Sequence, residues 1–270
     1  MSRSIAWIDG QWLKNDDRSI PLNDRGLLLA DGLFETVLIR DGLPLLLTEH
    51  LQRWSSGAAL LEMDAPPDSR QLLPLIQNAV QRCDLFSGFG ALRLNWSRGT
   101  TIERGIGLPP PGGHRFWLSL HPCQPCFTPA ATIISRHERR NAQSRLSGCK
   151  TFAYGPSIQA RREAEQQGAD DALLLNTLGQ LCCGTVANIL VKRGEQWLTP
   201  PLSSGCLAGV MRGQAIQQGV ASEADLGGTF QPGDQALLIN SLGCRPVHSV
   251  DGIALTPPTN VETIWNSLLA

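Results

Sequence analysis

Two of the chain's Asp-Gly dipeptides each separate a pair of apolar segments that have the pattern of strands. Asp9-Gly10 separates residues 5–8 from residues 11–13, and Asp41-Gly42 separates a long apolar segment from residues 43–47. Aspartate and glycine tolerate the positive φ angles that a two-residue turn between antiparallel strands requires. The sequence therefore predicts two β-hairpins, and the fold must include a sheet built from them.

Two amphipathic helices are predicted in the first half of the chain. The first is expected to have Thr48 as its capping residue and to bury one stripe of side chains, namely Leu51, Trp54, Ala58 and Leu61. Arg53 lies off this stripe, where an arginine is usually solvated. The second helix is expected over residues 69–83, and strands are expected at residues 91–96 and 116–120. This mixture of helices and strands indicates an α/β fold.

A proline-rich segment at residues 121–129 is expected to divide the chain. We expect a smaller N-terminal α/β domain at residues 1–120, a linker at 121–129, and a larger C-terminal domain at residues 130–270. The elements expected in the second domain are strands at residues 131–135, 172–175, 180–183, 187–191 and 235–239, a helix at 157–167 and a hairpin at 247–253. Residues 205–212 are expected to turn into a helix whose first amide groups suit a phosphate.

Composition and charge make several classes of protein improbable. The formal net charge of −1 gives no indication of a nucleic-acid or membrane-surface partner. Arg3, Asp9 and Lys14 interrupt the first residues, so we expect no signal peptide or membrane span and a soluble, cytoplasmic protein. The eight cysteines are then expected to be reduced thiols. Cys123 and Cys126 have the spacing of a redox pair or of half a zinc site, but no second pair exists, so no metal site is predicted.

Lys150 is the lysine with the most distinctive surroundings. It follows the small residues Ser147-Gly148-Cys149 and is followed four residues later by Tyr154, the only tyrosine, whereas Lys14 and Lys192 stand beside turn residues. An amine that points inward from a structured junction loses solvation, so its pKa falls and it can act as a nucleophile or base. Such a lysine can form a Schiff base with an aldehyde cofactor. A lysine at a loop end without a chemical role fits the same residues.

Four sequence blocks, in this order along the chain, resemble the fold-type IV pyridoxal-phosphate enzymes, or class IV aminotransferases. The blocks are Asp24-Arg25-Gly26 with Asp31–Thr36, the Lys150 block, residues 179–188, and Asn240–Val247. The first and last blocks are most similar to the aminodeoxychorismate lyase branch. The resemblance implies a D-amino-acid-aminotransferase-like fold of two α/β domains, with pyridoxal 5′-phosphate between them. It also implies a small-molecule substrate and a homodimer.

The resemblance also implies roles for individual residues. Lys150 becomes the Schiff-base lysine, and Tyr154 approaches the cofactor ring oxygen. The residues expected around the phosphate are Arg53, Val210, Met211, Asn240 and Ser241, while Leu207 packs against the face of the ring. Arg104 lies where a D-amino-acid aminotransferase branch has a carboxylate-binding arginine, and a solvated loop arginine fits that position equally well.

One position departs from the family pattern. The family segment Gly-x-x-x-Glu-Gly-Thr-x-x-Asn corresponds to Gly179–Asn188, in which Cys183 replaces the glutamate that meets the pyridine nitrogen. A carboxylate there keeps the ring nitrogen protonated and makes the ring a strong electron sink. A thiol with an ordinary pKa of about 8.5 is a weaker partner, unless cationic neighbours convert it to a thiolate.

Three functional hypotheses follow from these residues. The first is a lyase that converts 4-amino-4-deoxychorismate to 4-aminobenzoate and pyruvate, with Lys150 removing the proton next to the amino group. The second is a branched-chain or D-amino-acid aminotransferase. The third is a binding protein that keeps the fold but has lost catalysis, for which the missing glutamate is the only support. Replacement of the glutamate by Cys183 favours the lyase, because elimination tolerates a weaker electron sink than transamination.

Overall fold

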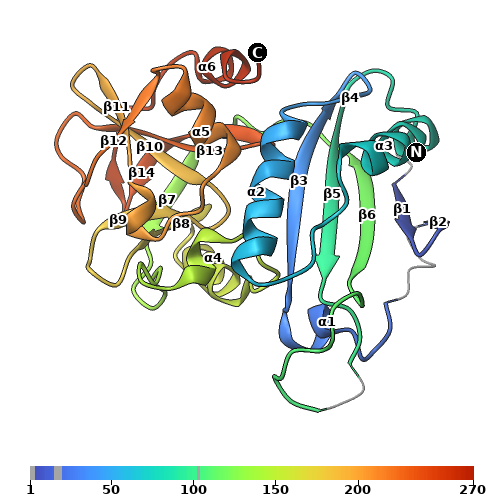
Figure 1. Ribbon diagram of the computed structural model, residues 1–270. Helices are drawn as coiled ribbons and strands as arrows, with labels where there is room; N and C mark the ends of the chain where they lie inside the picture. Colours follow the sequence, from blue (N-terminus) through green and yellow to red (C-terminus); the bar gives the residue numbers. More distant parts are fainter. Residues whose placement is uncertain (1–3, 15–19, 102–103) are drawn as a thin grey trace. The chain divides into compact units, whose positions relative to one another are not determined.

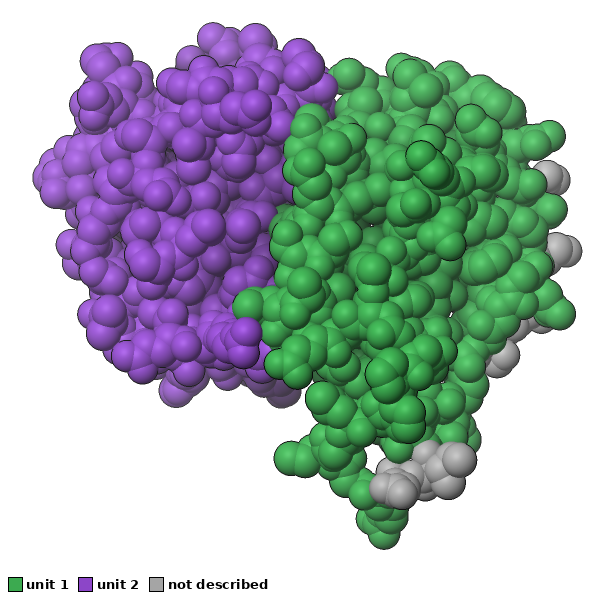
Figure 2. Space-filling view, in the orientation of Figure 1, with its two compact units in different colours: residues 1–124, 150–153 green, residues 125–149, 154–270 purple. Residues whose placement is uncertain are grey.

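The computed structural model describes residues 4–14, 20–101 and 104–270 (Figure 1). The chain forms two compact units, which Figure 2 shows in different colours. Unit 1 comprises Met1–Gln124 and Lys150–Ala153, and unit 2 comprises Pro125–Cys149 and Tyr154–Ala270. The chain therefore passes between the units three times, and Lys150 belongs to unit 1. The predicted division into domains at residues 121–129 stays a prediction.

Unit 1 is built on a six-stranded antiparallel sheet with the strand order β2-β1-β6-β5-β3-β4. Its strands are β1 (Ile5–Ile8), β2 (Gln11–Lys14), β3 (Gly32–Arg40), β4 (Leu43–Pro44), β5 (Phe89–Ser97) and β6 (Arg115–Pro122). Both predicted hairpins are confirmed, since β1 pairs with β2 and β3 with β4. The φ angles are 49° and 83° at Asp9 and Gly10, and 52° and 81° at Asp41 and Gly42, as such turns require.

Helices α2 (Leu47–Leu60) and α3 (Ser69–Cys83) pack on this sheet, and a short helix α1 (Arg25–Leu29) precedes β3. The predicted bounds of α3 are confirmed. The predicted cap of α2 is wrong: Leu46 occupies the cap position without a side-chain hydrogen bond, and Thr48 lies inside the helix. The buried residues of α2 are His50, Trp54, Gly57 and Ala58. This stripe differs from the predicted one because His50 turns inward to contact Glu35 on β3.

The two faces of the sheet in unit 1 have different roles. Strand pairing places Leu33 of β3 on the same face as Trp96 and Phe116, and this face meets the helices through the contact of Trp54 with Phe116. The next residue, Phe34, pairs with Asn95 and therefore lies on the opposite face. The side chains of Phe34 and Glu35, which are adjacent in sequence, therefore lie on opposite faces of the sheet.

Unit 2 contains a nine-stranded sheet. Its strands are β7 (Ala130–Ile134), β8 (Asp171–Leu175), β9 (Leu181–Gly184), β10 (Asn188–Arg193), β11 (Gln196–Thr199), β12 (Ala221–Glu223), β13 (Gln235–Asn240), β14 (Gly243–Val250) and β15 (Ile253–Ala254). Strand β9 pairs with β8 and also with β10, so β10, β13, β14, β7, β8 and β9 form a closed ring. The five single strands predicted for this half are confirmed to within one or two residues, and the predicted hairpin is formed by β14 and β15.

Three helices pack on this sheet, with α4 (Gly155–Gln166) on β8, α5 (Val210–Gln217) on β12 and β13, and α6 (Val261–Ser267) on β14. Two 3₁₀ turns, η2 (Arg145–Gly148) and η3 (Leu202–Ser204), lie in the connections. Apolar side chains of the strands form one buried cluster around Leu173, Ile189 and Leu238. A second buried cluster joins β7, β8 and β9 to Ala160 and Ala164 of α4. None of the described helices is long and apolar enough to cross a bilayer.

Candidate cofactor site

Lys150 is held beside strand β3 in unit 1. The amide of Phe34 donates to the carbonyl of Lys150 at 2.9 Å, and the amide of Phe152 donates to the carbonyl of Gly32 at 3.0 Å. The Nζ atom of Lys150 lies 4.3 Å from the centre of the Phe34 ring. The half-buried side chain is therefore fixed at its base by the backbone and placed over an aromatic face. This is a structured position, as the sequence predicts.

A buried charge cluster links β3 to α2 on the helix side of the sheet. Arg53 donates to Glu35 through two nitrogens, Nε to Oε1 at 2.8 Å and Nη2 to Oε2 at 2.5 Å. His50 Nδ1 lies 2.7 Å from Oε2 of the same carboxylate. Glu35 is fully buried, and its carboxylate orients the guanidinium of Arg53. Arg53 is therefore a positioned side chain and not the solvated helix arginine that its place off the stripe would indicate.

The ionisation of this cluster follows from its contacts. Burial alone would raise the pKa of Glu35, but the charge of Arg53 and the hydrogen bonds from His50 and Arg53 outweigh it and lower the pKa to about 2. Burial lowers the pKa of His50, and the positive charges of Arg53 and Lys150 add to that effect. The cluster is therefore a carboxylate, a guanidinium and a neutral imidazole at neutral pH.

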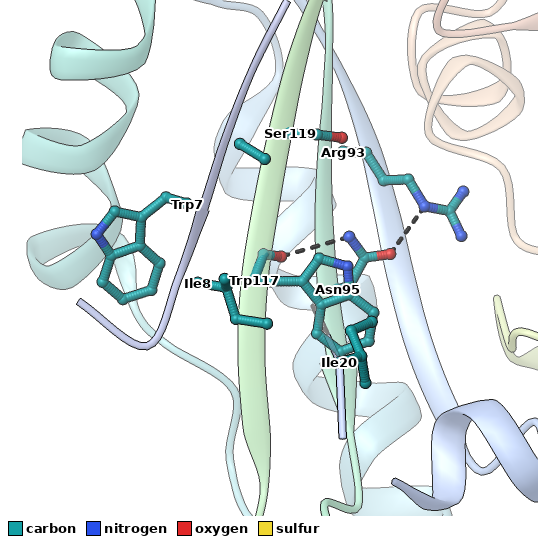
Figure 3. A pocket seen from close by; sticks show the side chains of 8 residues that line it. Trp7, Ile8, Ile20, Arg93, Asn95, Trp117 and Ser119 are labelled. Atoms are coloured by element: carbon teal, nitrogen blue, oxygen red, sulfur yellow. Dashed lines mark hydrogen bonds between the residues drawn. The ribbon is translucent and has the colours of Figure 1, made fainter. Parts of the chain in front are cut away.

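Arg93 lies beside the Phe34 ring, on the face of the sheet that is opposite to helices α2 and α3. The guanidinium carbon of Arg93 lies 3.5 Å from the centre of that ring, and Arg93 Nε donates to Asn95 at 2.8 Å. Arg93 and Asn95 also line a pocket of about 180 Å³ on this face (Figure 3), together with Ala6, Trp7, Ile8, Ile20, Trp117 and Ser119. Figure 3 shows the hydrogen bonds that connect Arg93, Asn95 and the backbone of Trp117. Lys150 and Arg93 therefore both contact the ring of Phe34.

In unit 2, the start of helix α5 has the geometry of an anion site. Gly209 occupies the cap position of α5 without a side-chain hydrogen bond, so the first amides of the helix, at Val210 and Met211, have no acceptor within the helix. A Cβ atom at Gly209 would lie 1.9 Å from Oδ1 of Asn188, and Asn188 Nδ2 donates to the carbonyl of Leu207 at 2.9 Å. Asn188 therefore fixes the backbone ahead of these amides. A phosphate group fits this helix start.

The other predicted residues of unit 2 lie at the ends of elements. Asn240 ends β13, donates to the carbonyl of Val186 at 3.3 Å and accepts from the amide of Leu242 at 2.8 Å, and Ser241 follows it. Tyr154 is half-buried at the cap position of α4. Arg104, in unit 1, is exposed. The cofactor roles of these residues stay predictions.

Cys183 lies on β9, opposite Leu174 on one side and Asn188 on the other. A hydrogen bond with Cys182 and burial raise the pKa of the Cys183 thiol well above its usual range. Arg140 acts in the other direction and does not reverse this. Burial and this hydrogen bond therefore favour the thiol form of Cys183 over the thiolate.

Metal ligation has no support in the described ranges 4–14, 20–101 and 104–270. No group of three or more His, Cys, Asp or Glu side chains there is arranged to hold a metal ion. All eight cysteines are unpaired thiols.

His50 and Arg93 lie outside the four sequence blocks, and Glu35 and Cys182 lie inside them without a predicted role. One signal does exist for Glu35, because a carboxylate within the apolar strand at residues 32–40 requires a partner when it is buried. The identity of that partner depends on which helix covers the strand. No sequence pattern provides that information.

The family model described as amino-transferase class IV matches residues 32–250 of this chain. Aminodeoxychorismate lyase from Bacillus subtilis is 24% identical over 210 residues, which cover 77% of this chain and 71% of that protein. A bifunctional aminodeoxychorismate lyase / D-amino acid transaminase from Mycobacterium tuberculosis is 27% identical over 220 residues, covering 73% and 71%. The PLP-bound form of a hypothetical aminotransferase from Mycobacterium tuberculosis has the same fold, with a TM-score of 0.81, 23% identity, and 98% and 97% coverage.

The chain belongs to the class IV aminotransferase family, because the match covers most of its length. It has the fold-type IV architecture, and pyridoxal 5′-phosphate (PLP) is the cofactor of this family. The chain is accordingly a PLP-dependent enzyme, either a lyase or an aminotransferase, that acts on a small molecule.

Proposed function

We propose that the chain is a 4-amino-4-deoxychorismate lyase, which forms 4-aminobenzoate, a folate precursor, and releases pyruvate. The observation that carries the proposal is the replacement of the family's glutamate by Cys183, a buried residue whose thiol has a raised pKa. Relatives named as this lyase support it. In this proposal Lys150 binds the cofactor covalently, and Arg53, Val210, Met211, Asn240 and Ser241 hold its phosphate.

Bound PLP supplies an aldehyde that takes up the substrate amine and a ring that withdraws electrons from the adjacent carbon. Nζ of Lys150 then takes the proton from the carbon that carries the amino group. The bond from the neighbouring carbon to the enolpyruvyl oxygen breaks, and its electron pair leaves with that oxygen. Protonation of the released enol gives pyruvate, and loss of the proton and the enolpyruvyl group makes the remaining ring aromatic.

The neutral Cys183 favours this reaction over transamination. A thiol balances the positive charge of a protonated ring nitrogen less well than a carboxylate, so it weakens electron withdrawal by the ring. Elimination tolerates this, because the leaving group carries the electron pair away. Transamination requires the pair to persist until a proton returns at a different carbon. An aminotransferase remains the second candidate, since D-alanine aminotransferases are also among the relatives.

The pocket on the Phe34 side of the sheet in unit 1 supports a substrate of this kind. Arg93 provides a cation for a carboxylate, while Trp117 and Ile8 provide apolar walls for a six-membered ring. Arg93 and Lys150 contact the same Phe34 ring, so the cation lies near the amine.

Purified protein loaded with PLP is expected to release pyruvate from aminodeoxychorismate and to exchange amino groups between amino acids and keto acids slowly. Cys183→Glu should raise the ratio of transamination to elimination, because a carboxylate strengthens electron withdrawal by the ring. Cys183→Ser is the matched control, since it changes the side chain without adding charge, and its ratio should stay near that of the wild type. Transamination that exceeds pyruvate release in the wild type would contradict the proposed lyase. A ratio that Cys183→Glu leaves unchanged would remove the argument from Cys183.

We also propose that the enzyme is a homodimer. A patch of exposed apolar side chains surrounds α1, consisting of Leu22, Leu27, Leu28, Leu29, Ile106 and Leu108. Arg25 joins its two segments by donating to the carbonyls of Gly107 at 3.0 Å and Ile106 at 3.4 Å. Contiguous exposed apolar side chains are typical of a protein interface, and a second copy of the chain is the proposed partner.

The double variant Leu27→Asp/Leu28→Asp is expected to shift the molar mass measured by light scattering from that of a dimer to that of a monomer. Ile253→Asp changes a comparably exposed side chain of unit 2 and should leave the dimer intact. A wild-type protein that is monomeric would refute the proposal. We further propose a cytoplasmic location, which recovery of the protein in a membrane or secreted fraction would contradict.

A further inference from the structure

Asn188 lies in unit 2 where strands β9 and β13 and the start of helix α5 meet. It is the first residue of β10, and it pairs with Ile239 of β13 on one side and with Cys183 of β9 on the other. Asn188 is 6% exposed, and its Nδ2 donates to the carbonyl of Leu207 at 2.9 Å. This residue therefore connects the strand that carries Cys183 to the segment that leads into α5.

The turn ahead of α5 is held by two hydrogen bonds to one oxygen. The carbonyl of Leu207 accepts from Nδ2 of Asn188 and also from the amide of Gly209, at 2.8 Å. A backbone carbonyl has two lone pairs, so this one is fully used. Gly209 is the cap residue of α5, and the amides of Val210 and Met211 follow it. The orientation of these amides is therefore set by a turn that Asn188 holds.

The absence of a side chain at position 209 is required by Asn188 and not by the backbone. Gly209 has a φ of −65° and a ψ of 139°, which residues with a side chain adopt readily. A Cβ atom at this position would lie 1.9 Å from Oδ1 of Asn188, whereas Cβ of Arg212 would be in ordinary contact at 3.7 Å. The turn and the asparagine side chain are therefore closely fitted to each other.

A second residue with a predicted phosphate role is attached to the hairpin formed by β9 and β10. Nδ2 of Asn240 donates at 3.3 Å to the carbonyl of Val186, which lies in the turn of this hairpin. The turn is closed by the amide of Gly184, which donates to the carbonyl of Ala187 at 2.9 Å. Asn240 and the start of α5 are therefore both connected to the hairpin that carries Cys183.

We propose that Asn188 is a positioning residue for the cofactor, which holds the first amides of α5 at a fixed spacing from Cys183. This role rests on the proposed binding of the phosphate by Val210 and Met211. The pyridine ring of PLP is rigid and its phosphate is attached through a short arm, so the spacing between the ring nitrogen and the phosphate varies little. A protein that fixes the matching groups in advance binds more tightly, because less freedom is lost on binding.

The test measures binding to the full-length protein freed of cofactor, with 4′-deoxypyridoxine 5′-phosphate and 4′-deoxypyridoxine as probes. Neither probe has an aldehyde that could react with Lys150, and the two differ in the phosphate alone. We define the phosphate preference as the ratio of their two dissociation constants. The wild type is expected to bind the phosphorylated probe more tightly. Asn188→Ala should reduce the phosphate preference about 2- to 10-fold, the usual effect of one hydrogen bond.

Gly209→Ala tests the fit between the turn and Asn188. Alone it should reduce the phosphate preference by about 10- to 10²-fold, because the new methyl group displaces the turn. In Asn188→Ala/Gly209→Ala the oxygen that this methyl group would meet is absent, so the preference should return to that of Asn188→Ala. Asn188→Thr is a second way to remove the amide donor with a residue that strands favour, and it should have the same effect as Asn188→Ala.

Thr132→Val is the matched control, because it also removes a buried hydrogen bond from a side chain to the backbone of unit 2. Oγ1 of Thr132 donates to the carbonyl of Ser249 at 2.9 Å, between β7 and β14. This variant should lower the free energy of unfolding and leave the phosphate preference unchanged. A purely structural role of Asn188 would give the same pattern, so the phosphate preference separates positioning from stability.

Circular dichroism establishes that each variant is folded. An unchanged phosphate preference in folded Asn188→Ala or Asn188→Thr would overturn the proposal, as would a double variant that binds no better than Gly209→Ala. A wild type without a phosphate preference would overturn it together with the phosphate role of Val210 and Met211. None of these measurements involves turnover, so a protein that behaves as expected but releases no pyruvate from aminodeoxychorismate refutes the lyase alone.

Discussion

Lys150→Ala is expected to abolish covalent attachment of the cofactor and to reduce turnover by at least about 10²- to 10⁴-fold, the usual contribution of a positioned acid–base group. The fold should survive the change, because the hydrogen bond between position 150 and Phe34 uses the backbone carbonyl. The side chain contributes a cation–π contact with the Phe34 ring, worth about 0.5 to 1 kcal/mol. Lys150→Ala should therefore lose activity while its free energy of unfolding changes little.

The measurement combines turnover with borohydride reduction of the PLP-loaded protein and peptide mapping. The reduced cofactor should be found on Lys150 in the wild type and on no lysine in Lys150→Ala. Lys192→Ala is the matched control, since Lys192 pairs with the exposed Glu195 at 3.2 Å and should have no effect on either readout. A label on Lys14 or Lys192 would refute the assignment of Lys150.

Much of the fold is predictable from local sequence patterns. The Asp-Gly turns define hairpins because few residues tolerate their φ angles, and the helix at residues 69–83 has both a periodic apolar face and a capping residue, Asp68. The first helix is predicted less accurately, since Thr48 has the chemistry of a cap but Leu46 takes that position. The buried stripe of this helix includes His50, because the imidazole contacts the buried carboxylate of Glu35 on β3. Tertiary contacts, and not local propensity, therefore determine where this helix begins and which of its residues are buried.

The candidate site is also predictable only in part from the sequence. Lys150 and Cys183 are marked by the family pattern, but their partners are set by strand register and packing. A single additional residue in β9 places Cys182 beside Cys183, and alternation along the strand would have placed them on opposite faces. The pairing of Phe34 with Asn95 likewise brings Arg93 to the ring that Lys150 contacts. Such contacts join residues far apart in the chain, so no local window contains them.

Glu35→Gln is expected to lower the free energy of unfolding by about 3 to 5 kcal/mol, because it leaves Arg53 without its buried carboxylate partner. The midpoint of denaturant unfolding should fall while the slope stays constant. Glu195→Gln is the control, since it removes a carboxylate that is 95% exposed and should change stability by less than about 0.5 kcal/mol. The double variant Glu35→Gln/Arg53→Met should be more stable than the sum of the two single losses predicts, because neither residue then leaves the other unpaired.

The same carboxylate predicts how stability depends on pH. The pKa of Glu35 is about 2 in the folded protein, below its usual value of 4.5, so the folded state binds fewer protons than the unfolded state between these values. Its contribution to stability is therefore complete above about pH 4.5 and is lost as the pH falls toward 2. Glu35→Gln has no proton to take up at this position, so its stability should fall less steeply across that range than that of the wild type. Parallel pH profiles for the two proteins would show that Glu35 is not held as a buried carboxylate, and the orientation of Arg53 would then need another cause.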